Sequence, residues 1–173
     1  MSSAKSLAAK KQDILKSWFQ VTVETYPADT ARFLKNQKDP FANPVGQTTY
    51  QSLETLVDAL ITGAGRDVMA KALDPLLRIR AVQTFTPSMA TGFIFSLKTI
   101  LRKHLSAAGN GSVEAYERFD RLIDEMAMIA FDIFVACREK IYELKANESR
   151  NQFFGSLKRA GLIVETEADG SGL

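Results

Sequence analysis

The stretch from Ser112 to about Arg150 constrains the fold most, because it predicts one helix of nearly forty residues. An average helix has only about 11–12 residues. Apolar side chains recur along the stretch at steps of three and four, which places them on one helical face. They are Tyr116, Phe119, Leu122, Ile123, Met126, Ala130, Ile133, Phe134, Cys137, Ile141 and Leu144.

The middle of this predicted helix differs from its C-terminal end. Between Met126 and Cys137 only Asp132 is charged, so we expect the segment to be covered on more than one side. After Cys137 charged residues are frequent again: Arg138, Glu139, Lys140, Glu143, Lys145, Glu148 and Arg150. The pattern predicts the last core helix of a domain, continuing beyond the core.

The remaining chain predicts further helices separated by turn signals. The N-terminal half gives a first helix from Lys5 or Ser6 to Glu24, with Leu7 on its apolar side, and a short helix over Ala28–Leu34. A loop follows over Lys35–Gln47, and then a helix from a capping box at Thr48 and Gln51 to about Thr62, which Gly63 ends. The C-terminal half gives a helix over Arg66–Gln83 with a break or kink at Pro75, and a helix over Thr86–Ala107 that Thr86-Pro87 opens and a turn at Gly109–Gly111 ends. The long helix capped by Ser112 follows, then a short helix over Asn151–Ala160 and a frayed tail over Gly161–Leu173.

No segment has the alternation of a strand, so the predicted class is all-α with five or six main helices. Globin-like helix crossings and a bundle would both satisfy the pattern. The net charge of +2 is too small to indicate a nucleic-acid partner. No uncharged apolar stretch of about 18 residues predicts a membrane span. Cys137, the single cysteine, excludes an internal disulfide and is consistent with a reducing cytoplasm, where we expect the protein to be located.

The usual catalytic patterns are absent from the sequence. It has no glycine-rich phosphate loop and no nucleophile elbow. A pair of Cys137 and His104 is disfavoured, because Cys137 is expected in the apolar core of its helix, where cysteine behaves as a small hydrophobe. We therefore predict no enzyme, and no catalytic, cofactor-binding or metal-binding residues.

Two residues, His104 and Asp132, each have more than one interpretation. His104, the only histidine, is predicted near the inner side of its helix, where it could hold haem iron; the simpler interpretation is a histidine at a helix C-terminus. Asp132 either points outward, or pairs with an arginine such as Arg78 or Arg80, or lies at a ligand pocket or dimer seam.

Two groups of residues could form a site but have simpler explanations. Arg78, Arg80 and Gln83 could bind an anion near a helix end, although a solvated face or an ion pair is the simpler interpretation. Four phenylalanines are expected mainly in the core, where a cavity among them could hold a small ligand: Phe93, Phe95, Phe131 and Phe134.

Several motifs together resemble the RsbRD N-terminal domain, the sensory module at the front of RsbR-type stressosome regulators. They occur in the same order over about Ile14 to Arg150. They are Phe41-Ala-Asn-Pro-Val-Gly46, Leu77-Arg-Ile-Arg-Ala-Val-Gln83, the segment from Ser88 to Lys98, Phe131-Asp-Ile-Phe134, Cys137-Arg-Glu-Lys140 and Asn147-Glu148.

The resemblance implies a globin-like helical domain without haem, which we place at residues 1–150. A short helix and a flexible tail are expected over 151–173 from the residues themselves. It also implies a homodimer, which we predict to form through the first and long helices. The last helix would lead to an output domain, which in the full-length regulators is a STAS domain that antagonises a kinase partner. About twenty residues follow Arg150 here, so we expect the sensory module to stand alone. Its output would then pass through dimerisation, an unknown protein partner or the tail. The alternative is a sensor for a small ligand or haem, with His104 at the pocket.

Overall fold

The fold was described from a computed structural model, over residues 3–107 and 112–162. These residues form eight α-helices and no strand. The helices are α1 (Ser3–Ala9), α2 (Lys11–Val23), α3 (Ala28–Asn36), α4 (Pro44–Thr62), α5 (Arg66–Ala81), α6 (Pro87–Thr91), α7 (Phe93–Ala107) and α8 (Val113–Arg159). The prediction of an all-α fold with a long C-terminal helix is confirmed.

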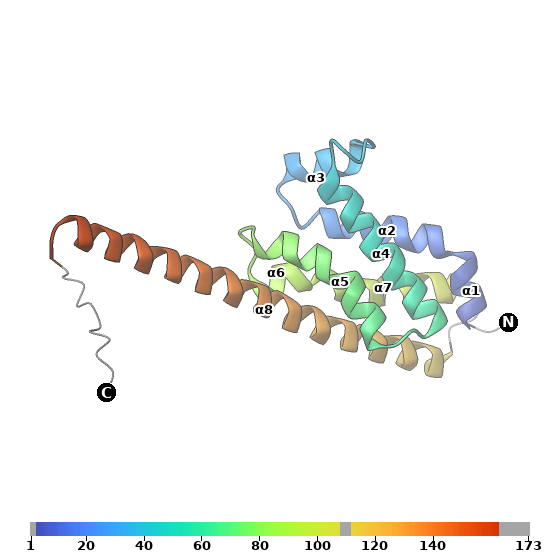
Figure 1. Cartoon of the computed structure of the whole chain (residues 1–173). Helices are drawn as coiled ribbons and strands as arrows, with labels where there is room; N and C mark the ends of the chain where they lie inside the picture. The colour runs from blue at the N-terminus through green and yellow to red at the C-terminus, as the bar shows by residue number, and fades with distance from the viewer. Residues whose placement is uncertain (1–2, 108–111, 163–173) are drawn as a thin grey trace, which may run out of the picture. The chain divides into compact units, whose positions relative to one another are not determined.

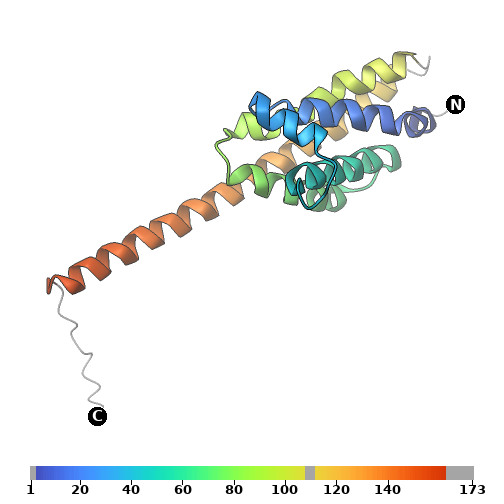
Figure 2. The same ribbon diagram turned by 90° about the horizontal axis from the view of Figure 1, so that it is seen from above.

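The chain divides into two compact units, Met1–Arg138 and Glu139–Leu173. Within the first unit, Figures 1 and 2 show α2 running beside α4 and α7, with α5 on the other side of α4. The short helix α3 lies near the N-terminal end of α4. On the surface, ion pairs of Lys11 join α2 to α4. Its Nζ lies 2.9 Å from Asp58 and 3.3 Å from Glu54 of α4.

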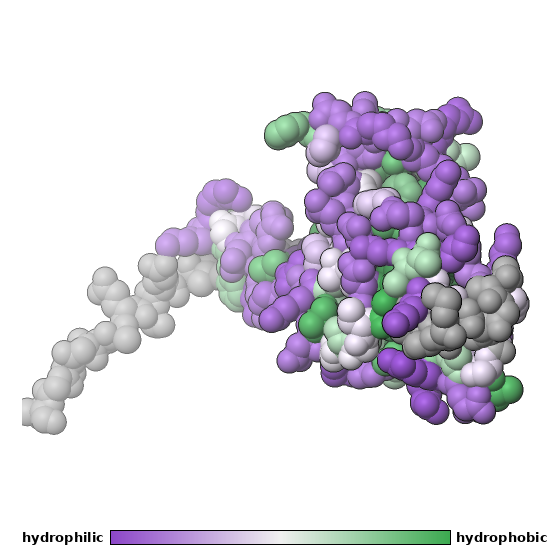
Figure 3. All heavy atoms as spheres, turned by 90° about the vertical axis from the view of Figure 1, so that its right-hand side faces the viewer, coloured by the Kyte–Doolittle hydropathy of each residue, from purple (hydrophilic) through white to green (hydrophobic). Residues whose placement is uncertain are grey.

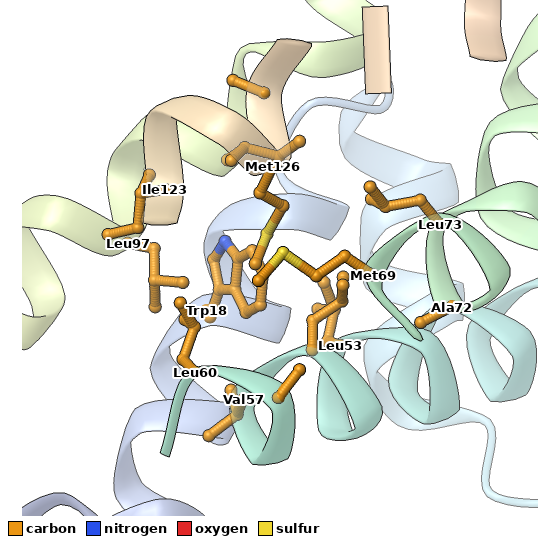
Figure 4. Close-up of a cluster of buried hydrophobic side chains, with 14 of the residues drawn as sticks. Trp18, Leu53, Val57, Leu60, Met69, Ala72, Leu73, Leu97, Ile123 and Met126 are labelled. Atoms are coloured by element: carbon orange, nitrogen blue, oxygen red, sulfur yellow. The ribbon is translucent and has the colours of Figure 1, made fainter. Parts of the chain in front are cut away.

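The hydrophobic core of this unit is built around Trp18 of α2, which is fully buried. Its indole Nε1 donates a hydrogen bond to the Phe93 carbonyl at 3.0 Å, so the polar end of the ring is satisfied. Figure 4 shows the thioethers of Met69 and Met126 beside the indole, with Leu53 and Leu60 below it. Residues from α2, α4, α5, α7 and α8 therefore meet at one side chain. On the face shown in Figure 3, by contrast, hydrophilic residues predominate.

The predicted first helix is wrong in one respect, because it is interrupted at Lys10 between α1 and α2. Neither proline nor glycine marks this break. Leu7 on α1 is nevertheless buried in the core, as the apolar pattern predicted.

The start of α4 was also predicted wrongly. The capping residue is Asn43, and not Thr48, which lies inside the helix. The Asn43 Oδ1 accepts a hydrogen bond from the Gly46 amide at 2.8 Å, and its Nδ2 donates to the carbonyls of Leu34 and Gln37, both at 3.0 Å. Pro44 occupies the first helical position, where its missing N–H is not needed. One buried side chain thus joins the end of α3 to the start of α4.

Pro75 does not break α5, contrary to one of the two outcomes predicted for it. Proline removes the N–H that would bond the Lys71 carbonyl. Both residues are exposed, so water can satisfy that carbonyl. The Gly63 end of α4 and the Thr86 cap of α6 are as predicted. The predicted helix from Thr86 to Ala107 is divided at Gly92 into α6 and α7.

Helix α8 begins as predicted, with the Ser112 hydroxyl accepting a hydrogen bond from the Ala115 amide at 3.2 Å. It does not end near Arg150, and there is no separate helix over Asn151–Ala160, because α8 is continuous to Arg159. Gly161 ends it with a φ of 66°, a conformation that favours glycine. The amides of Gly161 and Leu162 close the turn onto Lys158 and Leu157. The rest of the predicted tail, residues 163–173, and the predicted turn at Gly109–Gly111 lie outside the described residues.

Replacement of Gly46 by alanine is expected to destabilise the fold by about 1–3 kcal/mol, because the new Cβ would lie 2.6 Å from the capping Asn43 Oδ1. The control is Gly65→Ala, where a Cβ meets no atom within 4 Å. Urea unfolding followed by the fluorescence of Trp18 measures both. Equal losses in the two variants would contradict the proposed role of Gly46.

Candidate functional site

Arg80, near the C-terminal end of α5, is completely buried and holds three segments together. Its Nη2 donates to the Thr22 carbonyl and the Thr25 Oγ1, both at 3.0 Å. Its Nη1 donates to the carbonyls of Met89 at 3.3 Å and Ala90 at 3.1 Å. The guanidinium therefore bonds the C-terminal end of α2 and the backbone of α6, places where carbonyls lack helical partners and a cation is favoured.

These bonds give a physical reason for the division between α6 and α7. In one continuous helix, the carbonyls of Met89 and Ala90 would accept from the amides four residues later. Arg80 takes both carbonyls instead. At Gly92, a side chain would bring a Cβ within 2.6 Å of the Ser88 carbonyl oxygen, so the residue at this junction must be small.

Aromatic rings complete the surroundings of Arg80. Its Cζ lies 4.6 Å from the ring centre of Phe93, 4.9 Å from that of Phe85 and 5.4 Å from that of Tyr26. Among the described residues, no carboxylate lies within ion-pair distance of the guanidinium. Burial lowers the pKa of Arg80, but arginine starts from so high a value that it stays a cation at neutral pH.

Three buried polar atoms near this arginine have no hydrogen-bond partner: Arg80 Nε, Tyr26 Oη and Gln83 Oε1. Burial raises the pKa of the Tyr26 phenol, so the group remains protonated and able to donate. Unpaired buried polar atoms are rare in folded proteins, and each calls for an explanation. The predicted group of Arg78, Arg80 and Gln83 is therefore divided: Arg80 and Gln83 belong to this region, whereas Arg78 pairs with Asp74 on the surface at 2.6 Å.

The sequence did contain a signal for the burial of Arg80. Leu73, Leu76 and Leu77 are fully buried on α5, and Arg80 follows them at steps of three and four. It therefore lies on the apolar face of its helix. The prediction of a solvated face or an ion pair was wrong for Arg80.

Asp132 points outward, which was one of the alternatives for it. Its side chain is 66% exposed and lies 3.5 Å from Arg66, so its ion-pair partner is neither Arg78 nor Arg80. An exposed pair of this kind contributes little to stability.

His104 and Cys137 are too far apart to form a pair. Helices α7 and α8 are antiparallel, since Lys98 pairs with Asp124 and the later Arg102 with the earlier Asp120. By this register, His104 lies opposite the region of residue 118, and Cys137 lies roughly 28 Å further along α8. Both side chains are half-buried, so the expectation that Cys137 lies in the core was wrong. Burial raises the pKa of the Cys137 thiol, which disfavours the thiolate.

An exposed apolar surface lies along the seam of α7 and α8, and we call Phe95, Met128 and Phe131 the seam surface. These side chains are 50%, 61% and 46% exposed. Lys98 connects them across the seam, because its Nζ bonds Asp124 and lies 5.9 Å from the ring centre of Phe95. Met128 and Phe131 follow Asp124 by one and two turns of α8.

The seam surface corrects two predictions. Phe93 and Phe134 are in the core, as expected, but Phe95 and Phe131 are not. The middle of α8 was expected to be covered on more than one side. Among the described residues, Met126 on one side of α8 is buried, whereas Met128 on the other side is exposed.

The second unit contains the last part of α8 and exposes large apolar side chains: Tyr142, Leu144, Phe153, Phe154 and Leu162. Phe153 and Phe154 contact each other edge to face, with ring centres 6.3 Å apart. No helix of the described part of the chain is long and apolar enough to cross a membrane. No group of three or more potential metal ligands occurs among the described residues.

Comparison with known proteins identifies the family. Residues 12–149 match the RsbT co-antagonist protein rsbRD N-terminal domain. The chain belongs to this family. It is also 32% identical over 101 residues to an uncharacterized protein of Archaeoglobus fulgidus, an alignment that covers 57% of this chain and 64% of that protein. No solved structure matches the chain.

The structure explains two of the motifs by which the chain resembles the RsbRD N-terminal domain. In Phe41–Gly46, Asn43 caps α4, and Gly46 leaves room for that cap. In Leu77–Gln83, Arg80 binds α2 and α6. Both motifs hold elements together within the first unit, and neither contains a catalytic arrangement.

Replacement of Arg80 by methionine is expected to destabilise the protein by about 3 kcal/mol or more, because it leaves several buried carbonyls unpaired. Arg78→Met, two residues away on the surface, should change stability by no more than about 0.5 kcal/mol. Denaturant unfolding monitored by circular dichroism distinguishes the two. Comparable effects of both substitutions would show that Arg80 does not hold the fold together.

Proposed function

We propose that this protein is a non-enzymatic regulatory domain that acts by self-association and by contact with a protein partner. Membership of the RsbRD N-terminal domain family supports a regulatory role. The observation that supports self-association is the seam surface, which the described residues leave uncovered.

The argument for a second copy as the occupant starts from α8. Its middle has the apolar composition of a helix covered on more than one side, yet Met128 is 61% exposed and Phe131 is 46% exposed. A second copy of the chain could bury this surface with its own seam surface, because a two-fold dimer uses the same patch of both copies. Lys98 and Asp124 at the edge of the surface form a polar rim of both signs.

The resemblance predicted a dimer through the first and long helices. The outer side of α2 carries mainly polar and charged residues, including Gln12, Asp13, Lys16 and Gln20. The seam surface, by contrast, places exposed apolar side chains of α7 and α8 next to each other. We therefore propose α7 and α8 as the interface.

The second unit is the proposed place for an output partner. Its described part combines exposed aromatic side chains with the charged residues that the sequence places after Cys137. Aromatic side chains surrounded by charges are typical of protein-binding surfaces. A regulatory signal would change the packing of α8 within the first unit and so reach this surface.

Phe131→Glu is expected to weaken self-association at least tenfold, about 1.4 kcal/mol, because it places a charge in an apolar interface. The control is Phe41→Glu, the same change at a residue that is 96% exposed and lies in the loop before α4. Analytical ultracentrifugation at micromolar concentration measures the association, and circular dichroism checks the fold. A wild-type protein that remains strictly monomeric would refute the proposed dimer.

The alternative of a haem or small-ligand sensor with His104 at the pocket makes a different prediction. Since His104 is only half-buried near the end of α7, we expect no axial ligation by this residue. The absorption spectrum of freshly purified protein, before and after addition of haemin, is the measurement. A Soret shift in the wild type that His104→Ala abolishes would favour the haem sensor over the proposed function.

A further inference from the structure

A cavity of about 540 Å³ lies beside the Arg80 region, between the α2–α3 turn, the start of α4 and the α5–α6 connection. This volume is in the range of sites that hold small molecules. Its walls are mainly apolar and include Leu34, Val45, Phe85 and Met89. It lies wholly within the first unit and is separate from the seam surface.

Six polar side chains stand among the apolar ones in this lining: Thr25, Tyr26, Thr30, Asn43, Gln83 and Thr84. Two of them, Tyr26 and Gln83, carry buried atoms without a hydrogen-bond partner. The Tyr26 residue is only 8% exposed, and its Oη has no hydrogen-bond partner. The Oε1 of Gln83 is buried and unpaired as well. An apolar cavity with a few polar groups that lack partners is the arrangement by which proteins orient small ligands.

The positive charge of Arg80, which lies behind the cavity wall, indicates the class of ligand that the cavity would bind. Four residues that line the cavity also contact the Arg80 guanidinium: Thr25, Tyr26, Phe85 and Met89. The guanidinium is held only by uncharged groups, so its positive charge is not neutralised nearby. In a poorly solvated region, such a charge acts over several ångströms and favours an anion in the cavity.

We propose that this cavity binds a small amphipathic carboxylate. Its apolar part lies against Leu34, Val45 and Phe85. Its carboxylate accepts a hydrogen bond from Tyr26 Oη, which a small movement of the side chain brings to the cavity surface, because the atom is buried in the unliganded protein. A half-turn of the Gln83 amide presents Nε2 as a second donor. The positive charge of Arg80 stabilises the bound anion from behind the aromatic wall. The inference deepens the proposed regulatory function by giving the chemical class of its signal, but binding and self-association are measured separately.

The direct test compares octanoate with 1-octanol, which has the same chain length and no charge. Isothermal titration calorimetry on the wild-type protein should show octanoate binding at least tenfold more tightly. Equal affinity for the two probes would overturn the role of the charge. No binding of either probe at millimolar concentration would overturn the site, while leaving the proposed dimer unaffected.

Tyr26→Phe is the decisive variant, because it removes one oxygen atom and keeps the ring. It should weaken octanoate binding about tenfold, the usual effect of losing one hydrogen bond to a charged group. It should change the midpoint of unfolding without ligand only slightly, because the hydroxyl makes no hydrogen bond of normal geometry there. If Tyr26 had a purely structural role, Tyr26→Phe would lower the midpoint of unfolding and leave octanoate binding unchanged. The control is Tyr50→Phe, at a neighbouring cavity, which should leave octanoate binding unchanged; loss of binding in that variant alone would place the site elsewhere.

Discussion

The burial of one guanidinium without a carboxylate determines how the first unit is assembled. A buried cation is costly unless its donors are satisfied. Arg80 meets that requirement by bonding carbonyls that helices α2 and α6 leave free at their ends, so the positions of three helices are tied to one side chain. The break between α6 and α7 follows from the same bonds. It places the Phe93 carbonyl where Trp18 can bond it, and Trp18 is the centre of the core.

The local features of the fold could be predicted from the sequence, and those made by distant contacts could not. Periodicity predicted the main helices, and Gly63 and Thr86 marked helix ends correctly because their effects are local. The bond from Arg80 to Thr22 joins residues 58 apart, which no local pattern records. Asn43 caps α4 while its amide binds the preceding helix, and this outweighed the capping signal at Thr48. The candidate site depends on such contacts, so the sequence named Arg80 and Gln83 but not Tyr26.

The middle of α8 shows what an apolar pattern can and cannot predict. The sequence indicated cover on more than one side, and composition does not distinguish cover by the same chain from cover by another copy. In the described residues Met126 is fully buried, whereas Met128 is 61% exposed. The side of α8 that carries Met128 is thus apolar but exposed. Exposed apolar groups of this kind commonly mark interaction surfaces, so the wrong prediction of burial points to a surface for association.

The cavity and the seam surface are connected through one short path. Arg80 contacts the walls of the cavity at Tyr26 and Phe85, and it also contacts Phe93, the first residue of α7. Phe95 of the seam surface is two residues further along the same helix. A carboxylate in the cavity would draw the guanidinium toward it and weaken its bonds to α6, the element that fixes where α7 begins. Coupling of this kind requires that α6 and the start of α7 have two arrangements of similar free energy. Two such arrangements are easier to reach at the α6–α7 junction than inside a helix. At this junction, bonds to the Arg80 side chain replace the regular helical hydrogen bonds.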